Sequence, residues 1–143
     1  TGTGALGGYL DDMIIDGIDI SPNMLEQARS KSRYRSLYVM DLSTTLSIED
    51  DQYNGFVSSG TFTHGHVGPG CFGELLRIAK PGALFCLGTI TSVFDQAGFG
   101  SAFARLVAQR CITPVEFEEI AVYQNKDHHH KDDTAFAAIF FKI

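Results

Sequence analysis

Residues 1–21, TGTGALGGYLDDMIIDGIDIS, constrain the fold more than any other stretch of this chain. They begin with a GxGxxG pattern at Gly2, and glycines permit positive φ and let a ligand approach the backbone closely. Apolar residues then recur at helical spacing over residues 6–13, and a β-branched run follows over residues 14–20. Asp19 ends that run, where open α/β sheets bind ligands and a carboxylate can accept from ribose hydroxyls. The stretch therefore predicts a nucleotide-cofactor site.

Strand and helix patterns alternate along the rest of the chain. Ser21 and Pro22 supply an N-cap and a first-turn proline for one helix. The final third instead holds two extended runs around a polar loop, which is a hairpin pattern. The predicted strands are 37–40, 53–59 and 83–90, the predicted helices are 23–31, 72–79 and 103–110, and the hairpin arms are 114–124 and 133–143. This order predicts an α/β fold, a Rossmann-like and mostly parallel doubly wound sheet with a C-terminal antiparallel hairpin.

Length and charge narrow the range of functions. The 143 residues suit one domain with one core. A formal charge of −6 lacks the basic surface of a nucleic-acid-binding protein. No apolar run reaches membrane-spanning length, and no charged and apolar leader is visible. We therefore expect a cytoplasmic protein that acts on a small-molecule substrate, without nucleic-acid or membrane partners, and the sequence leaves its oligomeric state open.

Cysteines and histidines point to no metal. Cys71, Cys86 and Cys111 are odd in number and widely spaced, which is typical of reduced thiols. The histidine triplet at residues 128–130 contains zinc-binding side chains, yet successive residues of a strand or turn point in different directions. We expect a solvated hairpin loop there and no metal site.

Five segments in order resemble the class I S-adenosylmethionine-dependent methyltransferases. They are GTGALGGYL, IDGIDISPNMLEQAR, YVMDLS, YNGFVSSGTFTHGHVGPG and LLRIAKPGALF. Within that group the chain looks most like the small methyltransferase-like proteins related to the Williams–Beuren region product. The resemblance implies S-adenosyl-L-methionine as cofactor and methyl transfer to a small-molecule acceptor, with a protein acceptor as the alternative.

The same resemblance assigns roles to individual residues. Gly2, Thr3 and Gly4 would contact the methionine moiety of the cofactor, and Asp19 would bind the ribose. Four residues would contact the adenine, namely Ile20, Met24, Asp41 and Leu42. Ser59, Gly60 and Thr61 would contact the sulfonium end. Phe62, His64 and His66 would hold the acceptor. Carboxylates suit hydroxyl and amino donors, and His64 could serve as the general base for an acceptor that arrives protonated.

The resemblance begins inside its first motif. The family has a strand that ends in an acidic residue just before the glycine-rich turn, and this strand lies between the second and fourth strands. We therefore expect residues 1–143 to form a single methyltransferase domain truncated at its N-terminus. We expect the natural polypeptide to carry that strand upstream, or a partner chain to supply it.

Three alternatives remain at this point. An NAD(P)-dependent oxidoreductase also uses GxGxxG followed by an acidic residue, although Asp41-Leu42 and the closing hairpin favour a methyltransferase. A non-catalytic or incomplete methyltransferase-like domain could serve as a binding module. A thiol enzyme could use Cys71 with His64 or His66, because a cysteine at a helix start can have a lowered pKa.

Overall fold

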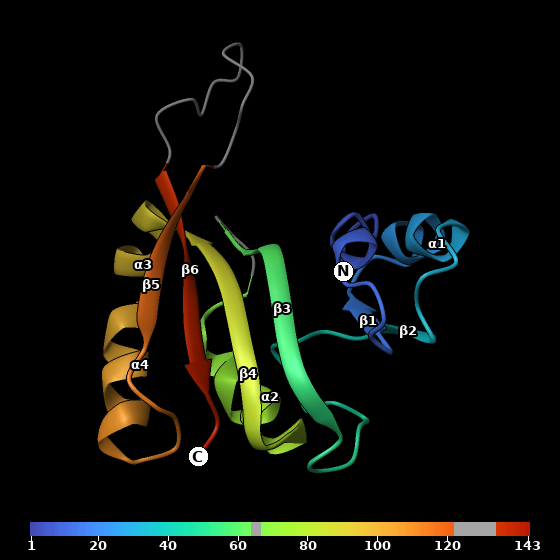
Figure 1. Ribbon diagram of the computed structural model, residues 1–143. Coiled ribbons are helices and arrows are strands. Elements are labelled where there is room, and N and C mark those ends of the chain that lie inside the picture. The colour runs from blue at the N-terminus through green and yellow to red at the C-terminus, as the bar shows by residue number, and fades with distance from the viewer. Residues whose placement is uncertain (64–66, 122–133) are drawn as a thin grey trace. The chain divides into compact units, whose positions relative to one another are not determined.

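A computed structural model describes residues 1–63, 67–121 and 134–143 of the chain. The chain folds into two compact units, Thr1–Leu46 and Ser47–Ile143. Both units contain helices and strands (Figure 1). The predicted α/β class is therefore confirmed.

The first unit is a small parallel β-α-β arrangement. After the 3-10 turn η1 (Leu6–Tyr9), it contains β1 (Asp16–Asp19), α1 (Pro22–Ser30) and β2 (Ser36–Val39). Strands β1 and β2 pair in parallel, with Asp19 opposite Val39. Helix α1 begins as the sequence predicts, because the Ser21 Oγ accepts a hydrogen bond from the Met24 amide at 3.4 Å and Pro22 lies in the first turn.

The helix predicted over residues 6–13 is wrong. Only η1 forms there, and Asp12 has a φ of 63°, which interrupts a right-handed helix. The strand indicated by the β-branched run at residues 14–20 is shorter in the structure, because β1 covers only Asp16–Asp19. Ile14 lies before this strand and is 78% exposed.

The second unit is a four-stranded mixed sheet with helices. Its strands are β3 (Tyr53–Phe62), β4 (Ala79–Ile90), β5 (Glu116–Ala121) and β6 (Thr134–Phe141), in the order β3-β4-β6-β5. Strand β3 is parallel to β4, whereas β6 is antiparallel to both β4 and β5. The predicted C-terminal hairpin is confirmed, and its second strand lies inside the sheet.

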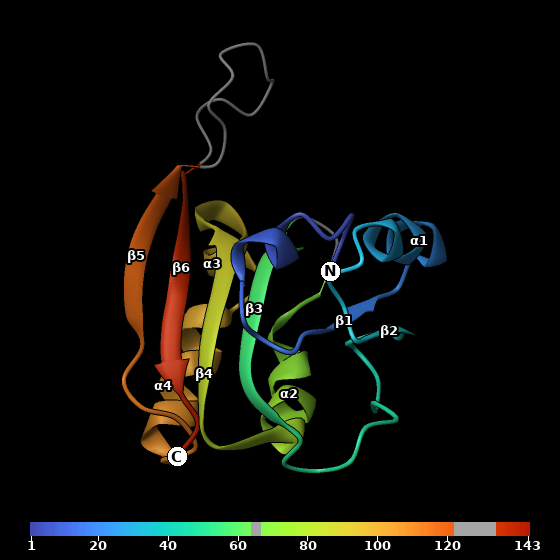
Figure 2. The ribbon, with the colours of Figure 1, turned by 45° about the vertical axis from the view of Figure 1, so that its right-hand side comes forward.

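Helices α2 (Phe72–Ile78), α3 (Thr91–Gln96) and α4 (Phe99–Ala108) cover one face of this sheet (Figure 2). Phenylalanines form the core between them. The Phe85 ring on β4 stacks between Phe56 at 4.6 Å and Phe140 at 4.8 Å. Phe140 also contacts Phe72 of α2 and Phe103 of α4. Burying each phenylalanine stabilises the fold by roughly 1.5–3 kcal/mol, so this layer fixes the helices on the sheet.

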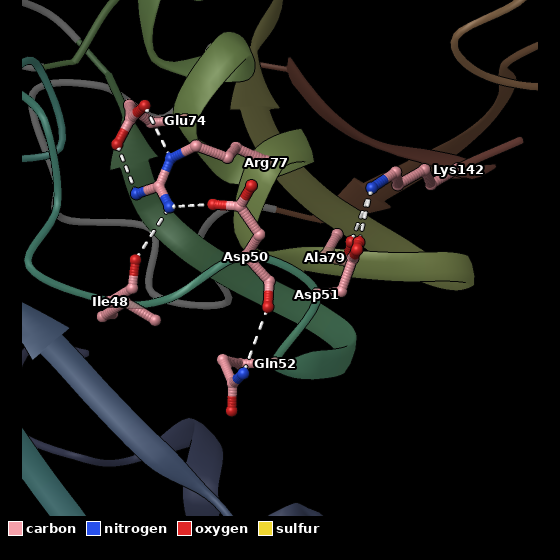
Figure 3. Close-up of polar contacts among 8 residues, drawn as sticks. All are labelled: Ile48, Asp50, Asp51, Gln52, Glu74, Arg77, Ala79 and Lys142. Carbon is pink, nitrogen blue, oxygen red and sulfur yellow. Dashed lines mark hydrogen bonds and ion pairs between the residues drawn. The ribbon is translucent and has the colours of Figure 1, made fainter.

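Two cationic side chains hold the segment before β3 against the rest of this unit (Figure 3). The Arg77 guanidinium donates to Glu74, to the Asp50 carboxylate at 2.7 Å and to the Ile48 carbonyl at 2.8 Å. The hydrogen bonds that Arg77 donates to both carboxylates raise its pKa. The Lys142 ammonium donates to Asp51 at 3.0 Å and to the Ala79 carbonyl at 2.7 Å. These ties fix the entry into β3.

Candidate cofactor site

The carboxylate of Asp19 organises the end of β1. Its Oδ2 accepts a hydrogen bond from the Gly2 amide at 2.7 Å, and its Oδ1 accepts one from the Ser21 amide at 2.9 Å. The Thr1 nitrogen donates to the Ile18 carbonyl at 3.0 Å and lies 3.6 Å from Oδ2. Asp19 therefore joins the glycine-rich turn to the start of α1.

The surroundings of Asp19 keep it ionised. Burial raises the pKa of Asp19, whereas hydrogen bonds from the Ser21 and Gly2 amides lower it, and the pKa lies below its ordinary value. Each carboxylate oxygen can accept more than one hydrogen bond. Each Asp19 oxygen accepts one hydrogen bond from a backbone amide. The remaining lone pairs suit a pair of hydroxyl donors.

The three glycines of the turn serve different purposes. Gly4 has a φ of 79°, and a Cβ there would lie 3.0 Å from the Ala28 backbone. A Cβ at Gly7 would lie 2.7 Å from the Tyr34 hydroxyl oxygen. Gly2 also has a positive φ, of 56°, but a Cβ there would meet no atom within 4 Å. Packing on α1 and Tyr34 explains the second and third glycines, whereas the first borders open space beside the exposed Thr3.

Asp41 follows the same end of β2. It lies two residues beyond Val39, the partner of Asp19 in the parallel ladder, so the two carboxylates follow the same end of the two strands. Asp41 Oδ1 accepts from the Ser43 hydroxyl at 2.6 Å and the Ser43 amide at 2.8 Å, and these two bonds lower the pKa of Asp41. The half-buried Leu42 follows it.

Apolar side chains are exposed next to Asp19. Ile20 and Met24 keep much of their surface accessible, although neighbouring Leu25 is buried. Exposed large apolar side chains beside a carboxylate can flank a planar ring while the carboxylate binds its polar edge. The first unit thus brings together the predicted residues Gly2, Asp19, Ile20 and Met24, with Asp41 at the tip of the adjacent strand.

The sequence did not identify the serines that orient the two carboxylates. Ser21 and Ser43 each donate a backbone N–H to the aspartate two residues earlier. This is the Asx-turn geometry, in which a side-chain oxygen takes the place of a backbone acceptor. The signal was available as the repeated D-x-S spacing after each of the two strands.

The residues predicted to contact the sulfonium end belong to the second unit, and they are Ser59, Gly60 and Thr61. Strand β3 continues through them to Phe62, with a register shift between Ser58 and Phe62. Gly60 has a φ of 77°, and its carbonyl accepts from the Thr63 hydroxyl at 3.2 Å. Ser59 and Gly60 are exposed and Thr61 is half-buried, which leaves this end of β3 accessible.

Phe62, which was predicted to hold the acceptor, packs in the core of the second unit. Its side chain is 2% exposed and its ring packs on Phe72 and Phe99. The predicted acceptor residues His64 and His66 lie outside the described residues, as does the histidine triplet at 128–130. Among the described residues, no group of three side chains could hold a metal ion.

The thiol-enzyme alternative conflicts with the environment of Cys71. The residue is 2% exposed, and burial raises the pKa of its thiol to about 12. A thiol in that environment stays protonated and is a poor nucleophile.

None of the helices in the described part of the chain has the length and apolar character needed to cross a bilayer.

Several solved structures share the fold of this chain. The chain is similar to the N-methyltransferase NodS of Bradyrhizobium japonicum WM9 (TM-score 0.69, 16% identity, 99% of this chain and 81% of that chain). It is also similar to the PH0226 protein of Pyrococcus horikoshii OT3 (TM-score 0.64, 19% identity, 99% of this chain and 78% of that chain). A third similar structure is the TehB-like SAM-dependent methyltransferase of Corynebacterium glutamicum ATCC 13032 Kitasato (TM-score 0.65, 21% identity, 99% of this chain and 76% of that chain). At these identities the likeness establishes a Rossmann-like class I methyltransferase fold.

The sequence itself assigns the family. Residues 1–87 match the family described as Methyltransferase domain, and the chain belongs to that family. This match includes the glycine-rich turn and both D-x-S carboxylates. No curated protein matches the sequence, so the closer resemblance to the Williams–Beuren region proteins stays a prediction.

Proposed function

We propose that this protein transfers a methyl group from S-adenosyl-L-methionine to a small-molecule acceptor. The observation that carries the proposal is the ionised Asp19 carboxylate, held by the Gly2 and Ser21 amides at the end of β1. The family match spans these residues. A NodS structure similar to this chain contains S-adenosyl-L-homocysteine, the demethylated product of that cofactor (TM-score 0.67, 14% identity).

The residues present fit this cofactor. Asp19 would accept the ribose hydroxyl protons, and Asp41 would accept from the adenine amino group. Ile20 and Met24 would flank the adenine, with Leu42 adding an apolar contact. The open side of Gly2 would admit the methionine moiety beside Thr3 and Gly4. Ser59, Gly60 and Thr61 would contact the sulfonium end.

When bound, the cofactor supplies an electrophilic methyl group on a positively charged sulfur. Methyl transfer to a nucleophile is an in-line displacement, so the protein mostly supplies proximity and orientation. His66 would help to hold the acceptor. His64 would take the proton of an oxygen, nitrogen or thiol acceptor that arrives protonated. The acceptor itself is a small molecule in this proposal, and a protein side chain is the alternative.

Calorimetry with two cofactors tests the proposal. We expect S-adenosyl-L-homocysteine to bind and NADH not to bind, because the family match favours a methyltransferase over a nicotinamide-dependent oxidoreductase. Binding of NADH alone would contradict the proposal. Release of labelled product from methyl-labelled cofactor, measured with a panel of small acceptors, separates an enzyme from a binding module that holds the cofactor without turnover.

A further inference from the structure

Strand β5 leaves one of its edges open. Among the described residues, Glu116–Ala121 pairs only with β6 and forms the edge of the sheet (Figure 1). An edge strand presents unpaired backbone donors and acceptors on its outer side. Extended peptide segments bind such edges by adding a strand, with side-chain pockets that select the sequence.

Two clefts flank Phe117 on the helix-covered face of this edge. The acidic cleft, of about 570 Å³, is lined by Phe94, Phe117 and Phe136 together with the carboxylates Asp95 and Glu119. The apolar cleft, of about 580 Å³, shares Phe94 and Phe117 and is lined further by Phe103, Val107, Pro114 and Val115. The two clefts are therefore neighbours that share two aromatic side chains.

Phe117 is exposed and yet held in place. It is 49% exposed at the strand edge. Its ring lies 5.5 Å from Phe94 at 85° and 5.1 Å from Phe136 at 84°, and Phe94 and Phe136 contact each other at 4.9 Å. Mutual edge-to-face contacts restrain all three rings. A pre-organised, accessible aromatic side chain is typical of residues that dominate protein–protein binding.

The charges at this edge favour a cationic partner. Asp95 and Glu119 are exposed, and the described residues that line the two clefts include no lysine or arginine. A second copy of β5 is disfavoured, because antiparallel pairing centred on Glu118 sets Glu118 against its own copy. Like charges placed directly opposite each other destabilise a ladder.

We propose that β5 binds an extended segment of a partner protein that carries an apolar residue and, two positions away, a lysine or arginine. Residues two apart on a strand share a face and lie about 6.6–6.8 Å apart, a spacing that suits adjacent clefts. The apolar side chain occupies the apolar cleft. The cationic side chain meets Asp95, Glu119 and the aromatic rings of the acidic cleft, which attract cations through charge and through their π-faces.

Synthetic peptides test the pattern. The probe is an acetylated and amidated Ser-Thr-Leu-Thr-Arg-Thr-Ser peptide, titrated into the full chain while amide signals are followed by NMR. Two controls replace its arginine by glutamate or place leucine and arginine next to each other. We expect shifts at residues 115–120 and affinity at least tenfold higher for the probe than for either control. Equal affinity for all three peptides, or no binding of the probe, overturns the proposal.

Matched variants test the site. Glu119→Lys should weaken probe binding at least fivefold, whereas Glu118→Lys makes the same charge change on the opposite face and should alter it less than twofold. Phe117→Leu keeps an apolar residue at the edge and should weaken binding about tenfold through loss of the ring. Equal effects of the two charge variants overturn the proposal. A dimer that Phe117→Leu dissociates also overturns it, because the edge would then bind a second copy.

Discussion

At the scale of single residues, Asp19 has both a local and a ligand-binding role. Its carboxylate fixes the backbone of Gly2 and Ser21, and its remaining lone pairs suit ribose hydroxyls. Ser43 fixes Asp41 in the same way after β2. Both aspartates were predicted from the sequence as strand-tip residues. The serine contacts required the structure, because the spacing D-x-S forms an Asx turn only in a suitable backbone conformation.

Asp19→Ala should weaken binding of S-adenosyl-L-homocysteine about tenfold to a hundredfold, because a hydrogen bond to a charged group contributes about 1.5–3 kcal/mol. It should also lower the melting temperature, since the variant frees the amides of Gly2 and Ser21. Calorimetry and thermal unfolding measure the two effects, with the exposed Asp11→Ala as control. Unchanged affinity with a lowered melting temperature would leave Asp19 a structural role alone.

His64→Asn should slow methyl transfer and leave cofactor affinity nearly unchanged, because His64 is proposed to act on the acceptor. Proton transfer by a positioned side chain contributes about a hundredfold or more to the rate. Turnover and calorimetry across a range of pH measure both quantities. A rate loss under twofold at every pH would exclude His64 from the mechanism.

Cys71 should make the stability of the fold depend on alkaline pH. Its folded-state pKa of about 12 exceeds the pKa of an exposed thiol, about 8.5, so the unfolded state loses its proton first. The stabilisation is complete below the unfolded pKa and is lost as pH rises toward the folded pKa. The loss amounts to about 1.4 kcal/mol per pH unit in that window.

Urea unfolding between about pH 8 and 11 measures this dependence on Cys71. Cys71→Ala should flatten the decrease in unfolding free energy as pH rises. Cys111→Ala removes a thiol that is not fully buried and should retain the slope. Equal slopes in the wild type and in Cys71→Ala would show that Cys71 does not cause the alkaline destabilisation.

At the scale of elements, the glycine-rich turn owes its shape to α1. Gly4 packs directly on the helix backbone at Ala28, whereas Gly2 has the same left-handed conformation with open space around it. Residues with a Cβ pay about 1–2 kcal/mol in the left-handed region. Steric contact with Ala28 adds to this cost at Gly4 alone.

Gly4→Ala should therefore destabilise the protein more than Gly2→Ala, because both substitutions strain φ and only the first meets backbone atoms at 3.0 Å. Urea unfolding compares the two variants. Gly2→Ala, in turn, should weaken binding of S-adenosyl-L-homocysteine without a comparable loss of stability. Equal losses of stability would mean that the turn is not fixed by its packing on α1.

The strands could be predicted more reliably than the first helix. Short, mostly apolar runs predicted 37–40 and 83–90, and the structure has β2 at Ser36–Val39 and β4 at Ala79–Ile90. The apolar spacing over residues 6–13 predicted a helix, yet only a 3-10 turn forms there. The glycines and the positive φ of Asp12 favour a turn over a longer helix. The burial of Phe62 could not be predicted, because a register shift after Ser58 changes which face a residue occupies.

At the scale of the molecule, β1 and β3 each have one ladder partner among the described residues, β2 and β4 respectively. The two ladders belong to separate sheets, one in each compact unit.

The position of β6 also sets an order for folding during synthesis. It is the last of the four strands in sequence, yet it lies between β4 and β5. After Ile90 ends β4, translation must add 44 residues to reach Thr134, which takes roughly 2–9 s at about 5–20 residues per second. Until β6 is made, the backbone donors and acceptors along that edge of β4 lack their strand partner. We therefore expect partial chains that end before Thr134 to aggregate more readily than the whole chain, because such an edge can pair with a second molecule.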